Sequence, residues 1–245
     1  MQNIVIVGNG GIGSNLGVPL VKLVTYLQNN RTIKGSVIIK VVDGDVVERK
    51  NVIRQAFINN EAGQKKSSVT AEYLQAVALE MGAEKVKVES HPYYLKDDNI
   101  ANLIRTNDIV LVGVDNYITR RIIEDRMKKL STVLVIVGGN EYDDGDVNVI
   151  HKENGKFLTP LYTEKHPEVL VKDLFPDQVS CEAGAVSAPQ LILANMTVAN
   201  FMLEAVHSYL TTKKVEWHEK MFDLKTGNVH TEGKDAMPIL FGNSK

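Results

Sequence analysis

A glycine-rich stretch directly follows the first apolar run of the chain. Gly8-Asn9-Gly10-Gly11-Ile12-Gly13-Ser14 satisfies the pattern G-x-G-x-x-G. Glycines there let the main chain approach a phosphate, and a helix that starts at this point offers unpaired N–H groups and the positive end of its dipole. The stretch predicts a nucleotide-binding loop. A tight turn that holds no ligand is the alternative interpretation.

A carboxylate follows the second apolar run, in Val41-Val42-Asp43-Gly44-Asp45. An acid at the end of this strand commonly binds the ribose hydroxyls of a nucleotide. Asp43 lies 30 residues beyond Gly13, whereas the dinucleotide fingerprint expects about 20. This spacing weakens an NAD assignment and does not exclude it.

Two cations come next along the chain. Arg54 lies in Asn51-Val52-Ile53-Arg54-Gln55, and Lys66 ends Gly63-Gln64-Lys65-Lys66. A triphosphate that is being cleaved requires such charges, because negative charge on the leaving pyrophosphate must be neutralised. We therefore expect Arg54 and Lys66 beside a nucleoside triphosphate, although either residue alone could be a solvated surface charge.

A third carboxylate, Asp115, follows the fourth apolar run in Gly113-Val114-Asp115-Asn116. The carboxyl ends of strands in an open α/β sheet form the crevice where ligands bind, so Asp115 is a candidate Mg²⁺ ligand. Aspartate is also a good N-cap, and capping the helix that follows is an equal alternative.

The remaining residues that could do chemistry do not form a motif. The single cysteine, Cys181, has Glu182 and Asp177 nearby, which disfavour a reactive thiolate, so we expect it to be structural. A cysteine that forms a covalent link to a substrate is the alternative. The histidines show no metal-ligand spacing and are assigned no catalytic role: His91, His151, His166, His207, His218 and His230.

These side chains require a scaffold of alternating strands and helices. The predicted strands are mostly apolar rather than alternating, as in a parallel sheet buried on both faces. They are Ile4–Val7, Val37–Val42, Val86–Glu89, Ile109–Val112 and Val133–Val137. Helical spacing runs from about Ile12 to Leu27, Lys66 to Met81, Asn99 to Arg105 and Ile118 to Leu130. The pattern predicts a Rossmann-like, doubly wound α/β fold.

The last hundred residues differ in pattern. Asp146–Ile150 predicts a strand, and the proline-containing segment 151–180 predicts a long crossover loop. Ala188–Leu210 predicts a helix that is apolar on more than one face, central to the fold or buried in an oligomer interface. Trp217–Asp223 and Asn228–His230 predict a hairpin. We expect one domain over 1–245, with a nucleotide-binding core at 1–150 and a C-terminal helix with antiparallel strands at 181–245.

Composition excludes several classes of protein. The 245 residues include 28 Lys+Arg and 30 Asp+Glu, so the basic excess typical of nucleic-acid-binding proteins is missing. One cysteine allows no internal disulfide. No apolar run reaches the roughly 20 residues of a membrane span. We expect a cytoplasmic protein without nucleic-acid or membrane partners.

Taken together, the motifs resemble the ThiF/MoeB/HesA family, to which ubiquitin-activating enzymes also belong. The order GxGGxGS, DxDxVxxxNxxRQ, GQxK and DNxxxR covers nearly the whole chain and is far more specific than any one motif. The stretch from Ser180 to Val186 and the helix after it resemble the family's closing segment. The chain is similar to the shorter members encoded on plasmids and phages.

The resemblance implies ATP-dependent adenylation of the C-terminal glycine carboxylate of a ubiquitin-like or sulfur-carrier protein, usually by a homodimer. It places Gly10, Gly11 and Gly13 at the phosphates and Asp43 at the ribose. It also implies that Asn51, Arg54, Gln55 and Lys66 surround the triphosphate and that Asp115 binds Mg²⁺.

Three departures from the family pattern affect these expectations. The paired cysteines of a structural zinc site are missing. Only Met1–Val7 precede the glycine loop, so the arginine that an N-terminal helix lends to the partner subunit's ATP would have to be replaced. No separate cysteine domain is evident, which disfavours a full activating and transferring enzyme. An NAD(P)-dependent oxidoreductase and a non-catalytic ATP-binding partner protein are the alternatives.

Overall fold

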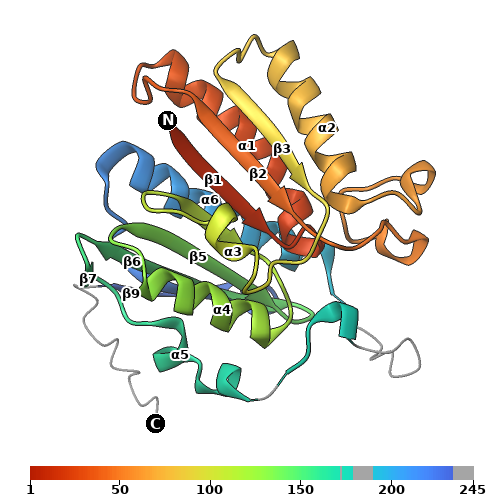
Figure 1. Ribbon diagram of the computed structural model, residues 1–245. Coiled ribbons are helices and arrows are strands. Elements are labelled where there is room, and N and C mark those ends of the chain that lie inside the picture. Colours follow the sequence, from red (N-terminus) through yellow and green to blue (C-terminus); the bar gives the residue numbers. More distant parts are fainter. Residues whose placement is uncertain (172, 179–189, 234–245) are drawn as a thin grey trace.

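The fold is built on one mixed β-sheet, seen in a computed structural model that describes residues 1–171, 173–178 and 190–233. The sheet order is β3-β2-β1-β4-β5-β6-β8-β9, with β7 paired to β6 (Figure 1). The parallel strands are β1 (Gln2–Val7), β2 (Val37–Val42), β3 (Val86–His91), β4 (Ile109–Val112) and β5 (Val133–Asn140). The antiparallel strands are β6 (Asp144–Glu153), β7 (Lys156–Phe157), β8 (Trp217–Asp223) and β9 (Asn228–Gly233).

Helices cover both faces of this sheet (Figure 1). On one face lie α1 (Gly11–Asn29), α2 (Lys66–Glu80) and α6 (Ile192–Thr212). On the other lie α3 (Ile100–Leu103), α4 (Tyr117–Lys128) and α5 (Tyr162–Lys165). This architecture confirms the predicted α/β fold with its C-terminal helix and antiparallel strands.

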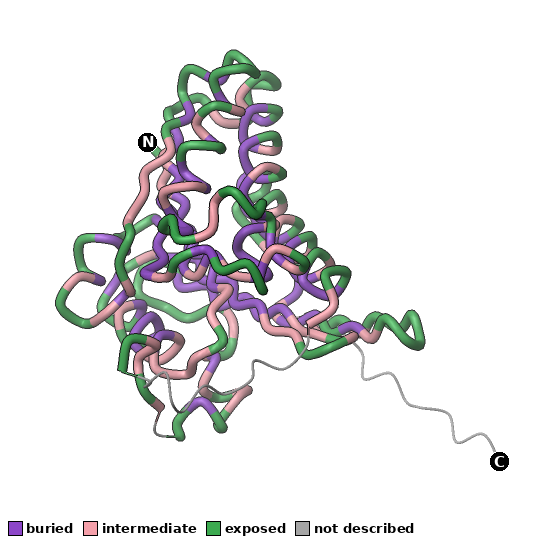
Figure 2. The backbone as a smooth tube through the Cα atoms, turned by 90° about the vertical axis from the view of Figure 1, so that its right-hand side faces the viewer, coloured by how far each residue is buried: buried purple, intermediate pink, exposed green. Residues whose placement is uncertain are grey.

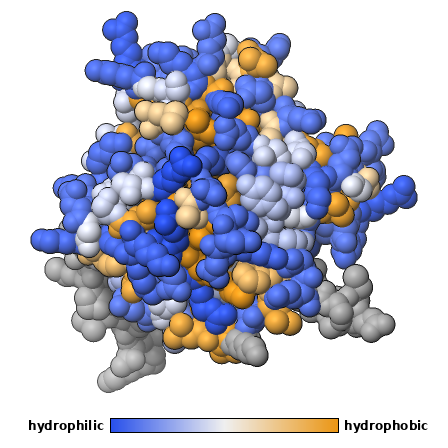
Figure 3. Space-filling view, viewed as in Figure 1, coloured by the Kyte–Doolittle hydropathy of each residue, from blue (hydrophilic) through white to orange (hydrophobic). Residues whose placement is uncertain are grey.

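The two-sided burial explains why the strands read as continuous apolar runs. Ile4 and Ile6 of β1 pack with α1, whereas Val5 and Val7 of the same strand pack with α4. All four side chains are at most 2% exposed. The central strands accordingly form the buried interior of the molecule (Figure 2). The front surface, by contrast, is largely hydrophilic, with scattered apolar side chains (Figure 3).

The strand register sets the position of the loops that follow. Val7 pairs with Val42 on one side and with Val112 on the other, so β1, β2 and β4 end level with one another. The residues after these three strands therefore emerge together at one edge of the sheet. Gly138 of β5 lies directly against Val198 of α6, where an added Cβ would come within 2.5 Å of the valine side chain.

The segment expected as a crossover loop, 151–180, is more structured than its prolines indicate. It contains the end of β6, then β7, α5 and two short 3-10 helices, Pro167–Leu170 and Pro176–Gln178. These elements are fixed by contacts to distant parts of the chain. Thr163, for example, donates from both its N–H and its hydroxyl to the buried carboxylate of Glu124.

The C-terminal predictions lie close to the observed elements. Helix α6 runs to Thr212, and the predicted start at Ala188 lies outside the described residues, as does Cys181. The predicted hairpin is β8 and β9, joined by a turn in which Gly227 has a φ of 74°. Among the described residues, no helix combines the length and apolar character that a bilayer span requires.

Candidate functional site

The pocket

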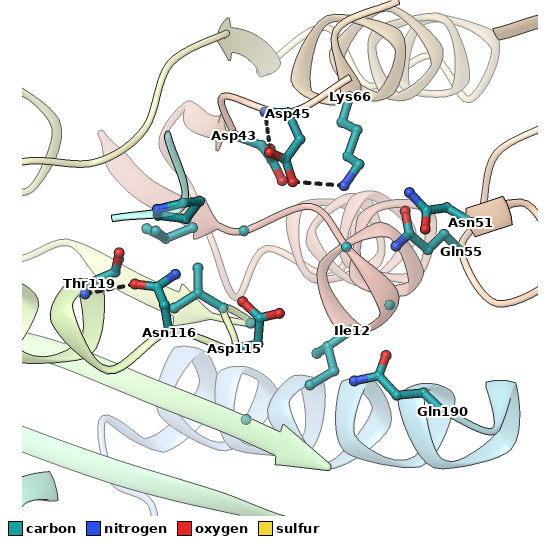
Figure 4. Close-up of a pocket in the computed structure, with 18 of the residues that line it drawn as sticks. Ile12, Asp43, Asp45, Asn51, Gln55, Lys66, Asp115, Asn116, Thr119 and Gln190 are labelled. Carbon is teal, nitrogen blue, oxygen red and sulfur yellow. Dashed lines mark hydrogen bonds and ion pairs between the residues drawn. The ribbon is translucent and has the colours of Figure 1, made fainter. Parts of the chain in front are cut away.

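A cavity of about 590 Å³ opens at the edge where β1, β2 and β4 end. Its size is in the range of small-ligand sites. Figure 4 shows Asp43, Asp45 and Lys66 on one side and Asp115 and Asn116 on the opposite side. Of the residues expected at a nucleotide site, the lining includes Gly10, Gly11, Asp43, Asn51, Arg54, Gln55, Lys66 and Asp115.

The glycine loop turns β1 into α1 at the floor of the pocket. Gly8 has a φ of 84°, a conformation that side chains disfavour, and a Cβ at Gly13 would lie 1.8 Å from the Gly8 carbonyl oxygen. Gly13 therefore permits close contact between helix and strand and does not itself face the cavity. At Gly10 the nearest atom to an added Cβ is the Gln55 amide nitrogen, at 3.8 Å, so the loop is open there.

The N-terminus of α1 is left available to a ligand. Gly10 occupies the N-cap position and supplies no side-chain hydrogen bond. The N–H groups of the first helical turn have no intrahelical acceptor, and the helix dipole makes this end positive. An open glycine beside these donors forms a cradle for an anion, and a phosphate is the anion that such loops bind.

The second glycine has a packing role that the motif does not reveal. A Cβ at Gly11 would lie 2.6 to 2.7 Å from the side-chain atoms of Asn195 on α6. Asn195 is fully buried and donates through Nδ2 to the Arg54 carbonyl oxygen at 3.3 Å. It thus joins α6, the glycine loop and the Arg54 segment, and no local pattern in the sequence identifies it.

Asp43 organises the main chain of the site. Its Oδ2 accepts from the Asn9 N–H at 2.6 Å, and its Oδ1 accepts from the Asp45 N–H at 2.7 Å. Burial raises the pKa of the Asp43 carboxyl above its ordinary value, although nearby Lys66 acts in the opposite direction. The Asn9 side chain is fully buried and donates to the Lys66 carbonyl and to Thr70, which links the glycine loop to α2.

Lys66 lies at the start of α2 with its ammonium group in the pocket. The residue is 5% exposed. Its Nζ lies 3.0 Å from Oδ2 of Asp45, and the hydroxyl of Tyr94 donates to the other carboxylate oxygen of Asp45. Burial opposes ionisation of Asp45, but Lys66, Tyr94 and Lys65 outweigh it and hold the Asp45 pKa below its ordinary value. The sequence patterns assign no role to Asp45 or Tyr94.

The Arg54 segment forms another wall. Arg54 donates to Gln190 and, at 3.4 Å, to the side chain of Asn51. Asn51 and Gln55 are 4% and 5% exposed, respectively. The Oε1 atom of Gln55 is buried and has no hydrogen-bond partner among the described residues. A buried amide without a partner is costly, and a ligand in the pocket could satisfy it.

Asp115 lies on the opposite wall and does not cap α4. The N-cap is Asn116, whose Oδ1 accepts from the Thr119 N–H at 3.0 Å. Asp115 is exposed and lines the cavity. Within the described ranges no cluster of three His, Cys, Asp or Glu side chains could hold a metal by itself. The capping alternative for Asp115 is therefore wrong, and its carboxylate is available to a ligand.

Arg120, the last residue of the DNxxxR motif, holds this wall in place. It donates to the Val114 carbonyl oxygen through Nε at 3.2 Å and through Nη2 at 2.9 Å. Its Nη1 donates to the Tyr162 hydroxyl at 2.5 Å, and its guanidinium lies over the Tyr162 ring. Arg120 thus ties the loop that contains Asp115 to helix α5.

Comparison with known proteins

A family-level comparison covers almost the entire described chain. The model of the ThiF family matches residues 1–234. The sulfur carrier protein adenylyltransferase of Thermus thermophilus is 32% identical over 150 residues, which are 61% of this chain and 49% of that protein. The adenylyltransferase and sulfurtransferase UBA4 of Debaryomyces hansenii is 26% identical, over 71% of this chain and 36% of that protein. The chain thus spans half or less of the length of these relatives.

Solved structures share the fold. Escherichia coli MccB crystallised with ATP superimposes with a TM-score of 0.65 at 16% identity, over 97% of this chain and 65% of that one. PaaA superimposes with a TM-score of 0.67 at 18% identity, over 95% of this chain and 73% of that one. At these identities the likeness establishes the architecture alone.

Proposed function

Since the chain belongs to the ThiF family, we propose that it is an ATP-dependent adenylyltransferase. It would activate the C-terminal carboxylate of a small ubiquitin-like or sulfur-carrier protein as an acyl-adenylate. The observation that carries the proposal is one pocket that combines the open Gly10 turn, the unpaired start of α1 and the side chains of Arg54 and Lys66. Relatives named as adenylyltransferases of sulfur carriers support the substrate class.

The chemistry is a nucleotidyl transfer. An oxygen of the carrier's terminal carboxylate forms a bond to the α-phosphorus of ATP, the bond from that phosphorus to the α,β-bridging oxygen breaks, and pyrophosphate leaves with the electron pair. Because the carboxylate is already ionised at neutral pH, no general base is needed. Catalysis would therefore rest on positioning and on charge neutralisation.

The residues of the pocket fit this task. The glycine loop and the start of α1 would bind phosphate oxygens, while Asp43 would orient the ribose. Arg54 and Lys66 would neutralise the charge that grows on the leaving pyrophosphate, with Asn51 and Gln55 as further donors. The unpartnered Oε1 of Gln55 is an acceptor, so it would take a hydrogen bond from a donor group of a ligand and not from a phosphate.

Asp115 would hold Mg²⁺, which when bound offsets phosphate charge. The carboxylate fits the role because it lines the cavity and does not cap α4. One protein carboxylate with substrate phosphates and waters is a common way to bind Mg²⁺. We also propose a homodimer, because the first turns of α6 expose Leu193 (56%) and Met196 (50%).

Exchange of radiolabelled pyrophosphate into ATP tests the function. We expect exchange that requires Mg²⁺ and a small protein ending in Gly-Gly, and no exchange when the terminal glycine of that protein is removed. ATP binding without exchange across candidate carriers would instead indicate a non-catalytic ATP-binding protein. Thermal stabilisation by NAD(H) and not by ATP with Mg²⁺ would indicate the oxidoreductase alternative.

A further inference from the structure

Asp43 and Asp45, which follow β2, make different kinds of hydrogen bond. Both carboxylate oxygens of Asp43 accept main-chain N–H groups, so this residue shapes the loop. Both carboxylate oxygens of Asp45 instead accept from side chains, the Lys66 ammonium and the Tyr94 hydroxyl. Tyr94, Asp45 and Lys66 therefore form a chain of side-chain hydrogen bonds that ends in the pocket.

Lys66 needs such a partner for two reasons. Its side chain is only 6% exposed, and a buried ammonium without a counter-charge loses most of its hydration. It is also the first residue of α2, a helix with no acidic residue in its first turn, so the positive end of the helix dipole opposes its charge. Asp45 offsets both effects.

The main chain around this ion pair is tied closely. The Lys66 N–H donates to the Asp45 carbonyl at 3.1 Å, and the Ser67 hydroxyl donates to the Asp43 carbonyl at 3.1 Å. The Lys65 ammonium donates to the Gly44 carbonyl. These hydrogen bonds tie the start of α2 to the loop after β2.

Tyr94 fixes the orientation of the Asp45 carboxylate, which in turn binds the Lys66 ammonium group. Its ring lies on Gly44, where an added Cβ would meet ring atoms at 2.7 to 2.8 Å. Burial raises the pKa of the Tyr94 hydroxyl, with Asp45 adding to the effect, so the hydroxyl stays protonated and donates. Tyr94 comes from the loop after β3, and no motif links it to Lys66.

We propose that Asp45 and Tyr94 are positioning residues that hold the Lys66 ammonium in place for phosphate before ATP binds. The proposal rests on the function proposed above and names residues that the ThiF resemblance does not assign. An ammonium group has three donors, and Asp45 uses one of them, so two remain for phosphate oxygens. A lysine held in advance loses less side-chain entropy when the ligand binds.

Two other roles for Asp45 predict results that differ from those of a positioning residue. If Asp45 were only a negative charge near the phosphates, Asp45→Asn would tighten ATP binding because repulsion is removed. If Asp45 were a Mg²⁺ ligand, the effect of Asp45→Asn would vanish when Mg²⁺ is removed. Positioning of Lys66 instead predicts weaker ATP binding with or without Mg²⁺.

Calorimetric titration of the full chain with ATP and with adenosine tests the proposal. We expect Asp45→Asn to weaken ATP binding about 10-fold or more, the size of a lost hydrogen bond to a charged group. Tyr94→Phe acts on Lys66 only through the Asp45 carboxylate and should weaken ATP binding less, about 3-fold to 10-fold. Adenosine, which carries no phosphate, should bind all variants within about two-fold of wild type. The matched control is Tyr93→Phe, because Tyr93 is 41% exposed and its hydroxyl lies on His91, outside the pocket lining.

A double-mutant cycle then shows whether Asp45 acts through the lysine. Once Lys66 is replaced in Lys66→Met, adding Asp45→Asn should change ATP affinity by no more than about two-fold. Additive losses would overturn the proposal, as would equal ATP affinities of Tyr94→Phe and Tyr93→Phe. A wild-type chain that fails to bind ATP would overturn the proposed function itself, and with it this proposal. Tyr94→Phe keeps every buried carbon atom, so it remains informative even where Lys66→Met fails to fold.

Discussion

The side-chain amide nitrogen Nδ2 of Asn195 donates to the main-chain carbonyl oxygen of Arg54 at 3.3 Å, although the two residues are 141 positions apart in the sequence. The same side chain fills the space above Gly11. Helix α6 therefore supports two walls of the pocket, although neither the glycine motif nor the Arg54 motif lies on it. Both Gly10 and Gly11 line the cavity, but they differ in what an added Cβ would meet: open space at Gly10 and the Asn195 side chain of α6 at Gly11.

Gly11→Ala and Gly10→Ala should accordingly fail in different ways. Gly11→Ala forces a Cβ to within 2.7 Å of a buried side chain, and overpacking of this kind costs about 1 to 3 kcal/mol. Gly10→Ala meets no atom nearer than 3.8 Å and should unfold near the wild-type temperature while losing ATP affinity. Thermal unfolding with and without ATP separates the two. Equal melting temperatures for both variants would contradict the packing role of Gly11.

Arg54→Ala and Lys66→Ala should lower kcat for adenylation more than they weaken ATP binding, because charge on the leaving pyrophosphate grows towards the transition state. A loss of about 100-fold to 1000-fold in kcat is the size expected for one preorganised donor. Steady-state exchange kinetics at varied ATP provide the measurement. A raised KM with unchanged kcat would assign both residues to ground-state binding.

Asp115→Asn should leave the fold intact and remove most Mg²⁺-dependent turnover, because Asn116 and not Asp115 caps α4. The matched change Asn116→Ala removes the cap and should cost about 1 kcal/mol of unfolding free energy. Urea unfolding and Mg²⁺ titrations of exchange activity distinguish the two roles. Activity of Asp115→Asn at the wild-type level would exclude it as the metal ligand.

The Asp45 ion pair should make stability depend on pH in a defined direction. The folded state holds the Asp45 pKa below its unfolded value of about 3.9. Its stabilisation is therefore present above that value and disappears as pH falls through the folded pKa. The difference in unfolding free energy between wild type and Asp45→Asn should be largest near neutral pH and should become smaller below about pH 4. We expect it to be at most about 1 kcal/mol, because the Asp45 carboxylate is partly exposed and screened by solvent. Urea titrations between pH 7 and 3 measure it, and a gap that widens on acidification would contradict the ion pair.

The exposed start of α6 should determine the oligomeric state. Charged substitutions Leu193→Glu and Met196→Lys should convert a dimer into monomers, because they place charge in a buried apolar contact. Tyr26→Glu on α1 is the control, since Tyr26 is also exposed, at 60%, but lies on another helix. Multi-angle light scattering at micromolar concentration gives the mass. A monomeric wild type would refute the homodimer.

Much of the fold could be predicted from the sequence because burial on both faces leaves a simple signal. Val37–Val42 and Ile109–Val112 are predicted with the bounds that the structure gives, since each run is apolar almost from end to end. The short elements between β6 and α6 leave no such signal. Helix α5, Tyr162–Lys165, is only four residues long and depends on Arg120 and Glu124 of α4 for its position.

The pocket was predictable only where motifs are local. The glycine loop and Asp115 follow strands whose ends the register brings together, and the sequence shows both features. Tyr94 lies 49 residues beyond Asp45, and its contact depends on how β3 pairs with β2. Asn195 is one of several polar residues in a mostly apolar helix, and nothing in the sequence sets it apart. Neither Tyr94 nor Asn195 lies at a sequence spacing from the motifs that would reveal its contact from a single sequence.

The dependence of the pocket on α6 also bears on how the chain matures during synthesis. A nascent chain that has not yet released residues 192–212 from the ribosome leaves Gly11, Gly138 and the Arg54 carbonyl without their buried neighbours. The parallel strands β1 to β5 precede α6 in the chain and can pair before that, but the nucleotide cradle can be completed only when α6 docks. On this arrangement, nucleotide capture would have to wait until residues 192–212 have left the ribosome.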